Sequence, residues 1–160
     1  MLRMLWTGEY DAEWEARFRQ VVQVKRAGFN LHNQFRHWMT EEEVIAALQG
    51  MDIFFVGYDP VTEGILDRAP ELKLILSERD GPEENIDLAA CRRRGIPVLN
   101  SAGRCTVSVA ELTMNLILNM SRPVLAVNRI IRQEGWSREN DQKLRDLVEA
   151  NSFEVYRKTL

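Results

Sequence analysis

The sequence predicts an α/β protein built around a parallel sheet of five strands with flanking helices. Short apolar runs alternate with amphipathic stretches along the chain, which is typical of βαβ units. The chain has 160 residues, of which 45% are hydrophobic and 28% are charged. A chain of this size and composition can bury one ordinary core, so we expect one domain with at most an appendage.

The first half of the chain supplies three of the expected strands. Their apolar runs occupy residues 2–6, 21–26 and 53–56. The stretch 11–20 predicts a helix, because Trp14 and Phe18 stand four residues apart and would both face the core. Another helix is expected after Thr40, since Thr40 and Glu43 have the spacing of a capping box.

The other two strands lie further along the chain. Residues 72–76 are apolar apart from one lysine and follow Pro70, which fits a buried parallel strand. Residues 96–99 are expected to form the last, short strand. Between them, residues 86–94 predict a helix whose inward side chains are Leu88, Ala89 and Cys91.

The C-terminal third is predicted to contain two helices followed by a linker. Residues 106–120 are apolar over more of their circumference than a one-sided surface helix needs, so this helix should have two partners. Pro123 suits the first turn of a second helix that runs to about residue 133. Residues 137–160 are strongly charged at first and resemble a linker more than a core element.

Charge and hydropathy exclude several classes of function. A formal net charge of -3 gives no electrostatic reason to bind nucleic acid. No apolar run approaches the roughly 20 residues of a membrane span, so we expect a cytoplasmic protein without a membrane partner. Cys91 and Cys105 are expected to be reduced, and His32 and His37 lack the spacing of a metal site.

Four loops follow strands of the predicted sheet, where open parallel sheets bind their ligands. They comprise residues 7–9, 57–60, 77–85 and 100–106. The first loop lacks the residues of a flavin phosphate loop. It also lacks the acidic pair of a response-regulator receiver, although Asp59 stands roughly where a phosphoacceptor would. The sequence therefore favours neither a flavin-binding protein nor a response-regulator receiver.

The loop 77–85 is a candidate anion site. Gly81 would let backbone amides approach an anion, and Arg79 is close by in the sequence. The alternative is a solvated acidic turn, since Glu78, Asp80, Glu83 and Glu84 outnumber the arginine. The loop 100–106 leads into a helix N-terminus, which favours a carboxylate or phosphate, or is simply a capped helix.

Three motifs in order carry a resemblance to a known family. They are N-I-D-L-A-A at 85–90, R-G-I-P-V-L-N at 94–100 and S-V-A-E at 108–111. The stretch 72–136 resembles the D-isomer-specific 2-hydroxyacid dehydrogenases, especially those similar to phosphoglycerate dehydrogenase. The resemblance implies a flavodoxin-like substrate-binding domain. It also implies that the catalytic groups and the glycine motif for NAD or NADP lie in a nucleotide-binding domain beyond residue 160.

The resemblance also assigns site residues. The backbone around Arg79, Asp80 and Gly81 would hold the carboxylate of a small 2-hydroxy or 2-keto acid. Cys105 falls where many members have an asparagine that contacts substrate, although a small buried thiol is the alternative. Val109 would lie near the cofactor. The loop at 77–85 is one residue longer than the family's pattern, and no catalytic or metal-binding residue is expected in this chain.

These expectations divide the chain into three parts. Residues 1–103 would be the substrate-binding domain, 104–136 the protruding interdomain and dimerisation helices, and 137–160 a linker into the absent domain. The resemblance implies a homodimer formed through residues 106–133. The alternative is that these helices pack only within their own chain. A last helix of the domain would also be absent, leaving some core surface bare. The expected function is a substrate-binding fragment that is inactive alone and binds no cofactor, and the alternative is a naturally short interaction or regulatory domain.

Overall fold

The computed structural model describes residues 1–28 and 38–156. The chain divides into two compact units, Met1–Arg104 and Cys105–Leu160, and each is described by itself. The prediction for His32 and His37 falls outside the described residues. No helix in the described part of the chain has the length and apolarity of a membrane span.

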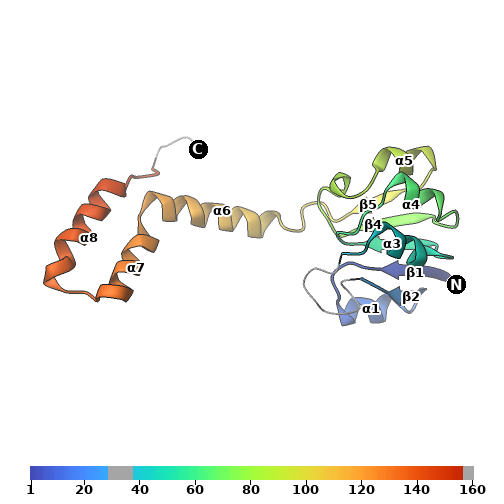
Figure 1. Ribbon diagram of the computed structural model, residues 1–160, viewed down its shortest axis with the longest axis horizontal. Coiled ribbons are helices and arrows are strands. Elements are labelled where there is room, and N and C mark those ends of the chain that lie inside the picture. Colours follow the sequence, from blue (N-terminus) through green and yellow to red (C-terminus); the bar gives the residue numbers. More distant parts are fainter. Residues whose placement is uncertain (29–37, 157–160) are drawn as a thin grey trace. The chain divides into compact units, whose positions relative to one another are not determined.

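The first unit contains a parallel sheet with strand order β2-β1-β3-β4-β5 (Figure 1). The strands are β1 Leu2–Trp6, β2 Val22–Arg26, β3 Ile53–Val56, β4 Leu74–Ser77 and β5 Val98–Asn100. The predicted five-stranded α/β fold is therefore confirmed. Strand β4 begins later than expected, because the amide of Leu72 still bonds to Ala69 in a turn. Chain order reverses between β1 and β3, which is the usual ligand position in such sheets.

Helices flank the sheet on both faces. They are α1 Ala12–Phe18, α3 Glu41–Leu48, α4 Glu63–Asp67 and α5 Leu88–Arg93. Helix α3 begins with the predicted capping box, since the Thr40 side chain and the Glu43 side chain each bond the other's backbone amide. Helix α4 was not predicted. It is short and is capped by Thr62.

The main core lies between the sheet and helices α3, α4 and α5. Leu5, Phe54 and Ile75 from three neighbouring strands are completely buried in it. The expectation for α5 was partly wrong, because Ala90 and Cys91 are buried whereas Leu88 and Ala89 are exposed. The helix starts two residues later than predicted, after an Asp87 N-cap.

The opposite face of the sheet is incompletely covered. One row of laterally paired residues runs across it, through Trp6, Phe55, Leu76 and Leu99. Trp6 is 1% exposed beneath α1, and Leu99 at the far end is 59% exposed. Phe18 of α1 packs edge-on against Trp6 at 5.7 Å, but Trp14 is half exposed, contrary to its predicted inward position. Phe55 and Leu76, which lie between Trp6 and Leu99 in the row, are partly buried, so the expectation of bare core surface stays a prediction.

The second unit contains α6 Thr106–Ser121, α7 Val124–Glu134 and α8 Arg138–Asn151. Helices α6 and α7 form where helices were predicted, whereas their interdomain role stays a prediction. The expectation of a linker after residue 137 was wrong over α8. This helix starts with a capping box between Ser137 and Asn140, and it buries Leu144.

Candidate substrate site at the carboxyl edge of the sheet

The candidate site lies where β1, β3, β4 and β5 end. Backbone hydrogen bonds continue past the strands, from the Thr7 amide to the Phe55 carbonyl and from the Glu78 amide to the Val56 carbonyl. The loops after these strands are therefore held side by side. Three of the four loops predicted from sequence lie entirely within the first unit, and so does the fourth loop as far as Arg104.

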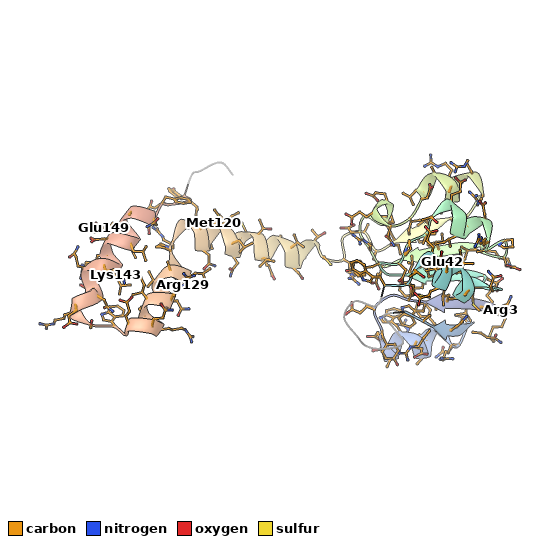
Figure 2. All side chains as sticks on the ribbon, in the orientation of Figure 1. Arg3, Glu42, Met120, Arg129, Lys143 and Glu149 are labelled. Carbon is orange, nitrogen blue, oxygen red and sulfur yellow. The ribbon has the colours of Figure 1, made fainter. Side chains whose placement is uncertain are left out.

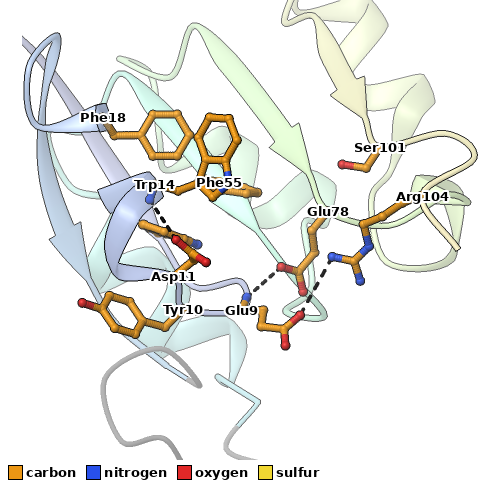
Figure 3. Close-up of a pocket in the computed structure, with 10 residues that line it drawn as sticks. Glu9, Tyr10, Asp11, Trp14, Phe18, Phe55, Glu78, Ser101 and Arg104 are labelled. Atoms are coloured by element: carbon orange, nitrogen blue, oxygen red, sulfur yellow. Dashed lines mark hydrogen bonds and ion pairs between the residues drawn. The ribbon is translucent and has the colours of Figure 1, made fainter. Parts of the chain in front are cut away.

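Glu78 occupies the space between the loops that follow β1 and β3. Its side chain is buried, and Oε2 accepts a hydrogen bond of 2.7 Å from the Glu9 amide (Figure 3). A Cβ on Gly57 would lie 2.7 Å from Oε1, and a Cβ on Gly8 would overlap Oε2. These two glycines therefore make room for the carboxyl group.

Burial raises the pKa of the Glu78 carboxyl. The Glu9 amide and the charge of Arg104 oppose this shift, whereas the charges of Glu9 and Asp59 add to it. The alternative of a solvated acidic turn included Glu78, and for this residue it was wrong. The sequence does contain a signal for this burial, which is a glycine soon after β1 (Gly8) and another directly after β3 (Gly57). Because glycine has no Cβ, it leaves space for a side chain from a neighbouring strand.

A hydrogen bond to Asp59 joins the loop after β3 to the segment before α3. Asp59 is 2% exposed, and its Oδ1 accepts a hydrogen bond of 2.7 Å from the Met39 amide. The Asn85 side-chain amide donates to the carbonyls of Gly57, at 3.3 Å, and of Asp59, at 2.7 Å. An enclosed, hydrogen-bonded carboxylate is poorly placed to accept a phosphoryl group, so the receiver interpretation loses its only candidate residue.

The structure brings Arg79, Asp80 and Gly81 to this edge. The Asp80 carboxylate accepts from the Gly103 amide at 3.1 Å, and its carbonyl accepts from the Asn100 side chain at 2.7 Å. These bonds tie the loop after β4 to the loop after β5. The backbone amides of Asp80 and Gly81 have no acceptor among the described residues.

The Arg79 side chain is held in place from two sides. It forms an ion pair with Glu84, and its guanidinium carbon lies 4.9 Å from the centre of the Tyr58 ring. Gly81 has a φ of −106°, so its backbone does not require glycine. The edge therefore offers a fixed cation and two unpaired amides to an anion.

Cys105 and Val109 belong to the second unit. Cys105 precedes α6 as its N-cap, its thiol is exposed, and its side chain makes no capping hydrogen bond. It is therefore not the buried thiol considered as the alternative. Val109 is also exposed. Their assignments to substrate and cofactor stay predictions.

A pocket of about 500 Å³ adjoins the incompletely covered face of the sheet and also includes Glu78. It was not predicted from the sequence. Its walls are largely aromatic, and charged groups lie at one side (Figure 3); the labelled lining residues are Glu9, Tyr10, Asp11, Trp14, Phe18, Phe55, Glu78, Ser101 and Arg104. No cluster of three potential metal-ligating side chains occurs among the described residues.

Comparison with known proteins identifies the family. Residues 9–158 match the family described as D-isomer specific 2-hydroxyacid dehydrogenase, catalytic domain. The chain is 30% identical over 123 residues to D-3-phosphoglycerate dehydrogenase of Methanocaldococcus jannaschii, and this match covers 76% of the chain and 22% of the relative.

Solved structures agree with this match. The TT0316 protein from Thermus thermophilus has a TM-score of 0.71 and 26% identity, over 89% of this chain and 44% of that one. The NADPH-dependent glyoxylate/hydroxypyruvate reductase from Sinorhizobium meliloti, at 19% identity and a TM-score of 0.65, shares the fold over 100% of this chain and 44% of its own. This chain thus spans less than half of each of these relatives. It belongs to the D-isomer-specific 2-hydroxyacid dehydrogenases.

Proposed function

We propose that this chain is the substrate-binding part of an NAD- or NADP-dependent oxidoreductase that interconverts a 2-hydroxy acid and its 2-keto partner. The observation that carries the proposal is the pair of unpaired amides at Asp80 and Gly81, next to Arg79 on the carboxyl edge. A carboxylate is the group that all such substrates share. Hydrogen bonds from amides and a nearby guanidinium are a suitable means of holding it.

The residues of this edge would bind and orient the substrate. The Asp80 side chain fixes the amide-bearing loop against Gly103, so these donors need little rearrangement when the carboxylate arrives. By the resemblance, Cys105 would contact the substrate and Val109 would lie near the cofactor. Groups that transfer the hydride and the proton would belong to the nucleotide-binding domain.

The described residues do not fit a dinucleotide at the switch point of their own sheet. Sheets of this strand order commonly bind such ligands between the loops after β1 and β3. Here the Glu78 carboxyl group fills the space beside Gly8 and Gly57. By the resemblance, the cofactor would be held by another part of the whole enzyme.

We also propose that a second copy of the chain covers α6. Its apolar side chains are largely exposed within the second unit, and Figure 2 labels Met120 near the end of this helix. They include Val107, Val109, Leu112, Met114, Leu116, Leu118 and Met120. So much exposed apolar surface on one helix is typical of an interface. The same surface would serve an interaction domain without catalysis, which remains the second candidate function.

One experiment separates these two candidates. The reading frame beyond Leu160 should encode a strand followed by G-x-G-x-x-G, and the longer protein should oxidise NADH or NADPH in the presence of 2-keto acids. The 160-residue chain should show no such turnover. An immediate stop codon, with a dimeric and inactive product, would favour the interaction domain. We further propose a cytoplasmic location for the protein.

A further inference from the structure

We propose that Trp38, Tyr58 and Arg79 form a recognition surface for an uncharged, flat side chain, so that the site prefers aromatic 2-keto acids to small ones. This inference rests on the proposed function and specifies the substrate class of the same site. The three residues come from different segments of the carboxyl edge. Trp38 precedes α3, Tyr58 follows β3, and Arg79 follows β4.

The three side chains stack on one another. The rings of Trp38 and Tyr58 are 6.1 Å apart between centroids and 19° from parallel. The Arg79 guanidinium carbon lies 4.9 Å from the centre of the Tyr58 ring. Both rings are nevertheless well exposed, at 63% for Trp38 and 52% for Tyr58. The stack therefore presents apolar surface beside the amides proposed to hold the carboxylate.

The backbone beneath the stack is fixed by buried groups. Met39, next to Trp38, donates its amide to the buried Asp59 carboxylate next to Tyr58. This single bond holds the two ring-bearing segments together. Arg79 is restrained in turn, because its amide donates to the Ser77 hydroxyl at 3.2 Å and its side chain pairs with Glu84. A preorganised surface loses little conformational entropy when a ligand binds.

Other exposed rings of the first unit are already covered by cations. The guanidinium of Arg17 lies 4.2 Å above Trp14, and that of Arg26 lies 3.8 Å above Tyr10. Trp38 stacks on Tyr58 and keeps the largest exposed fraction of these rings, 63%. A substrate ring added to this pair would gain offset stacking as well as apolar burial.

The charges around Tyr58 argue against a phosphorylated side chain. A neighbouring pocket of about 490 Å³ is lined by Tyr58 together with Glu83, Glu84 and Asp87. These carboxylates would repel a second anionic group on the substrate. A substrate whose remaining part, beyond its carboxylate, is neutral avoids this repulsion.

The test compares two 2-keto acids that share the same carboxylate and carbonyl. Phenylpyruvate and pyruvate are titrated into the 160-residue chain, and their dissociation constants are measured by ligand-detected NMR. We expect phenylpyruvate to bind about tenfold more tightly, from one ring stacked on the pair plus its buried area. Trp38→Ala should bring the ratio close to one without weakening pyruvate by more than about twofold. Tyr58→Leu should also bring the ratio close to one, although it removes a contact of Arg79 as well.

Trp14→Ala is the matched control, because it removes another half-exposed tryptophan and should leave the ratio unchanged. A ratio near one in the unsubstituted chain, or a ratio that survives both stack substitutions, would overturn the inference and leave the carboxylate site standing. Binding of neither acid would contradict the proposed substrate site itself.

Discussion

The two faces of the sheet are built from alternate residues of the same strands, yet they are covered to very different degrees. On one face, Leu5, Phe54 and Ile75 are completely buried beneath α3, α4 and α5. On the other, burial decreases along a single row from Trp6 to Leu99. The described chain thus covers one face of the sheet fully, whereas apolar side chains on the other face stay partly exposed. Residues of similar hydrophobicity should therefore contribute very unequally to stability.

The largest expected effect separates the two faces directly. Phe54→Ala should lower the free energy of unfolding by about 3–5 kcal/mol, because it leaves a cavity in the closed face. Leu99→Ala should change it by no more than about 0.5 kcal/mol, because Leu99 is already exposed. Urea denaturation followed by circular dichroism gives both values. Similar losses for the two variants would mean that the second face is covered after all.

A smaller effect is expected at the carboxyl edge, where both faces end. Gly8→Ala should cost about 1–3 kcal/mol of unfolding free energy, because the new methyl group collides with the Glu78 carboxyl group. The double variant Gly8→Ala, Glu78→Ala should lose less than the sum of the two single variants, since the collision partner is gone. If the losses of the two single variants simply add in the double variant, the Gly8 methyl group and the Glu78 carboxyl group do not collide.

The raised pKa of Glu78 predicts a pH dependence of stability. The folded carboxyl group holds its proton more tightly than the unfolded one, whose pKa is near the ordinary 4.5. Unfolding free energy should therefore fall as pH rises from the unfolded pKa to the folded pKa, and stay lower above it. Glu78→Gln should abolish this decrease and gain relative stability towards neutral pH. Glu83→Gln, at an exposed position, is the control and should retain the decrease.

The smallest effect on stability is expected on α6, where the readout is association. Leu116→Glu should change unfolding free energy by no more than about 0.5 kcal/mol, because Leu116 is 54% exposed. It should nevertheless raise the monomer fraction in light scattering if α6 faces a second copy. Ile130→Glu should act in the same direction but with a greater loss of stability, because Ile130 is partly buried. A monomeric parent chain at high concentration would contradict the dimer.

Local signals explain which features could be predicted from the sequence. The capping box at Thr40 and the apolar runs of the strands depend on neighbouring residues, and the structure contains them. Helix α8 was missed because Asn140, rather than Glu or Gln, completes its capping box, and because charged residues surround Leu144. The inward face of α5 was misjudged because a helix of 6 residues shows too little periodicity in the sequence to indicate which side chains face the core.

The site was less predictable because its key contacts join distant segments. Arg79 and Gly81 were found from the composition of one loop and from a family resemblance. The burial of Glu78 depends on glycines in two other loops, and the stacking of Trp38 on Tyr58 depends on the Asp59 bond to Met39. No single stretch of sequence contains these relationships.

The bonds that Asp59, Asp80 and Asn85 make to backbone groups also bear on how the edge can move. Each joins segments 20 or more residues apart, and together they connect the loops after β3, β4 and β5 with the start of α3. Loops linked in this way cannot open one at a time. If the proposed substrate site closes when a ligand binds, these loops should move as one rigid piece, and their amides should exchange with solvent as a single cooperative unit.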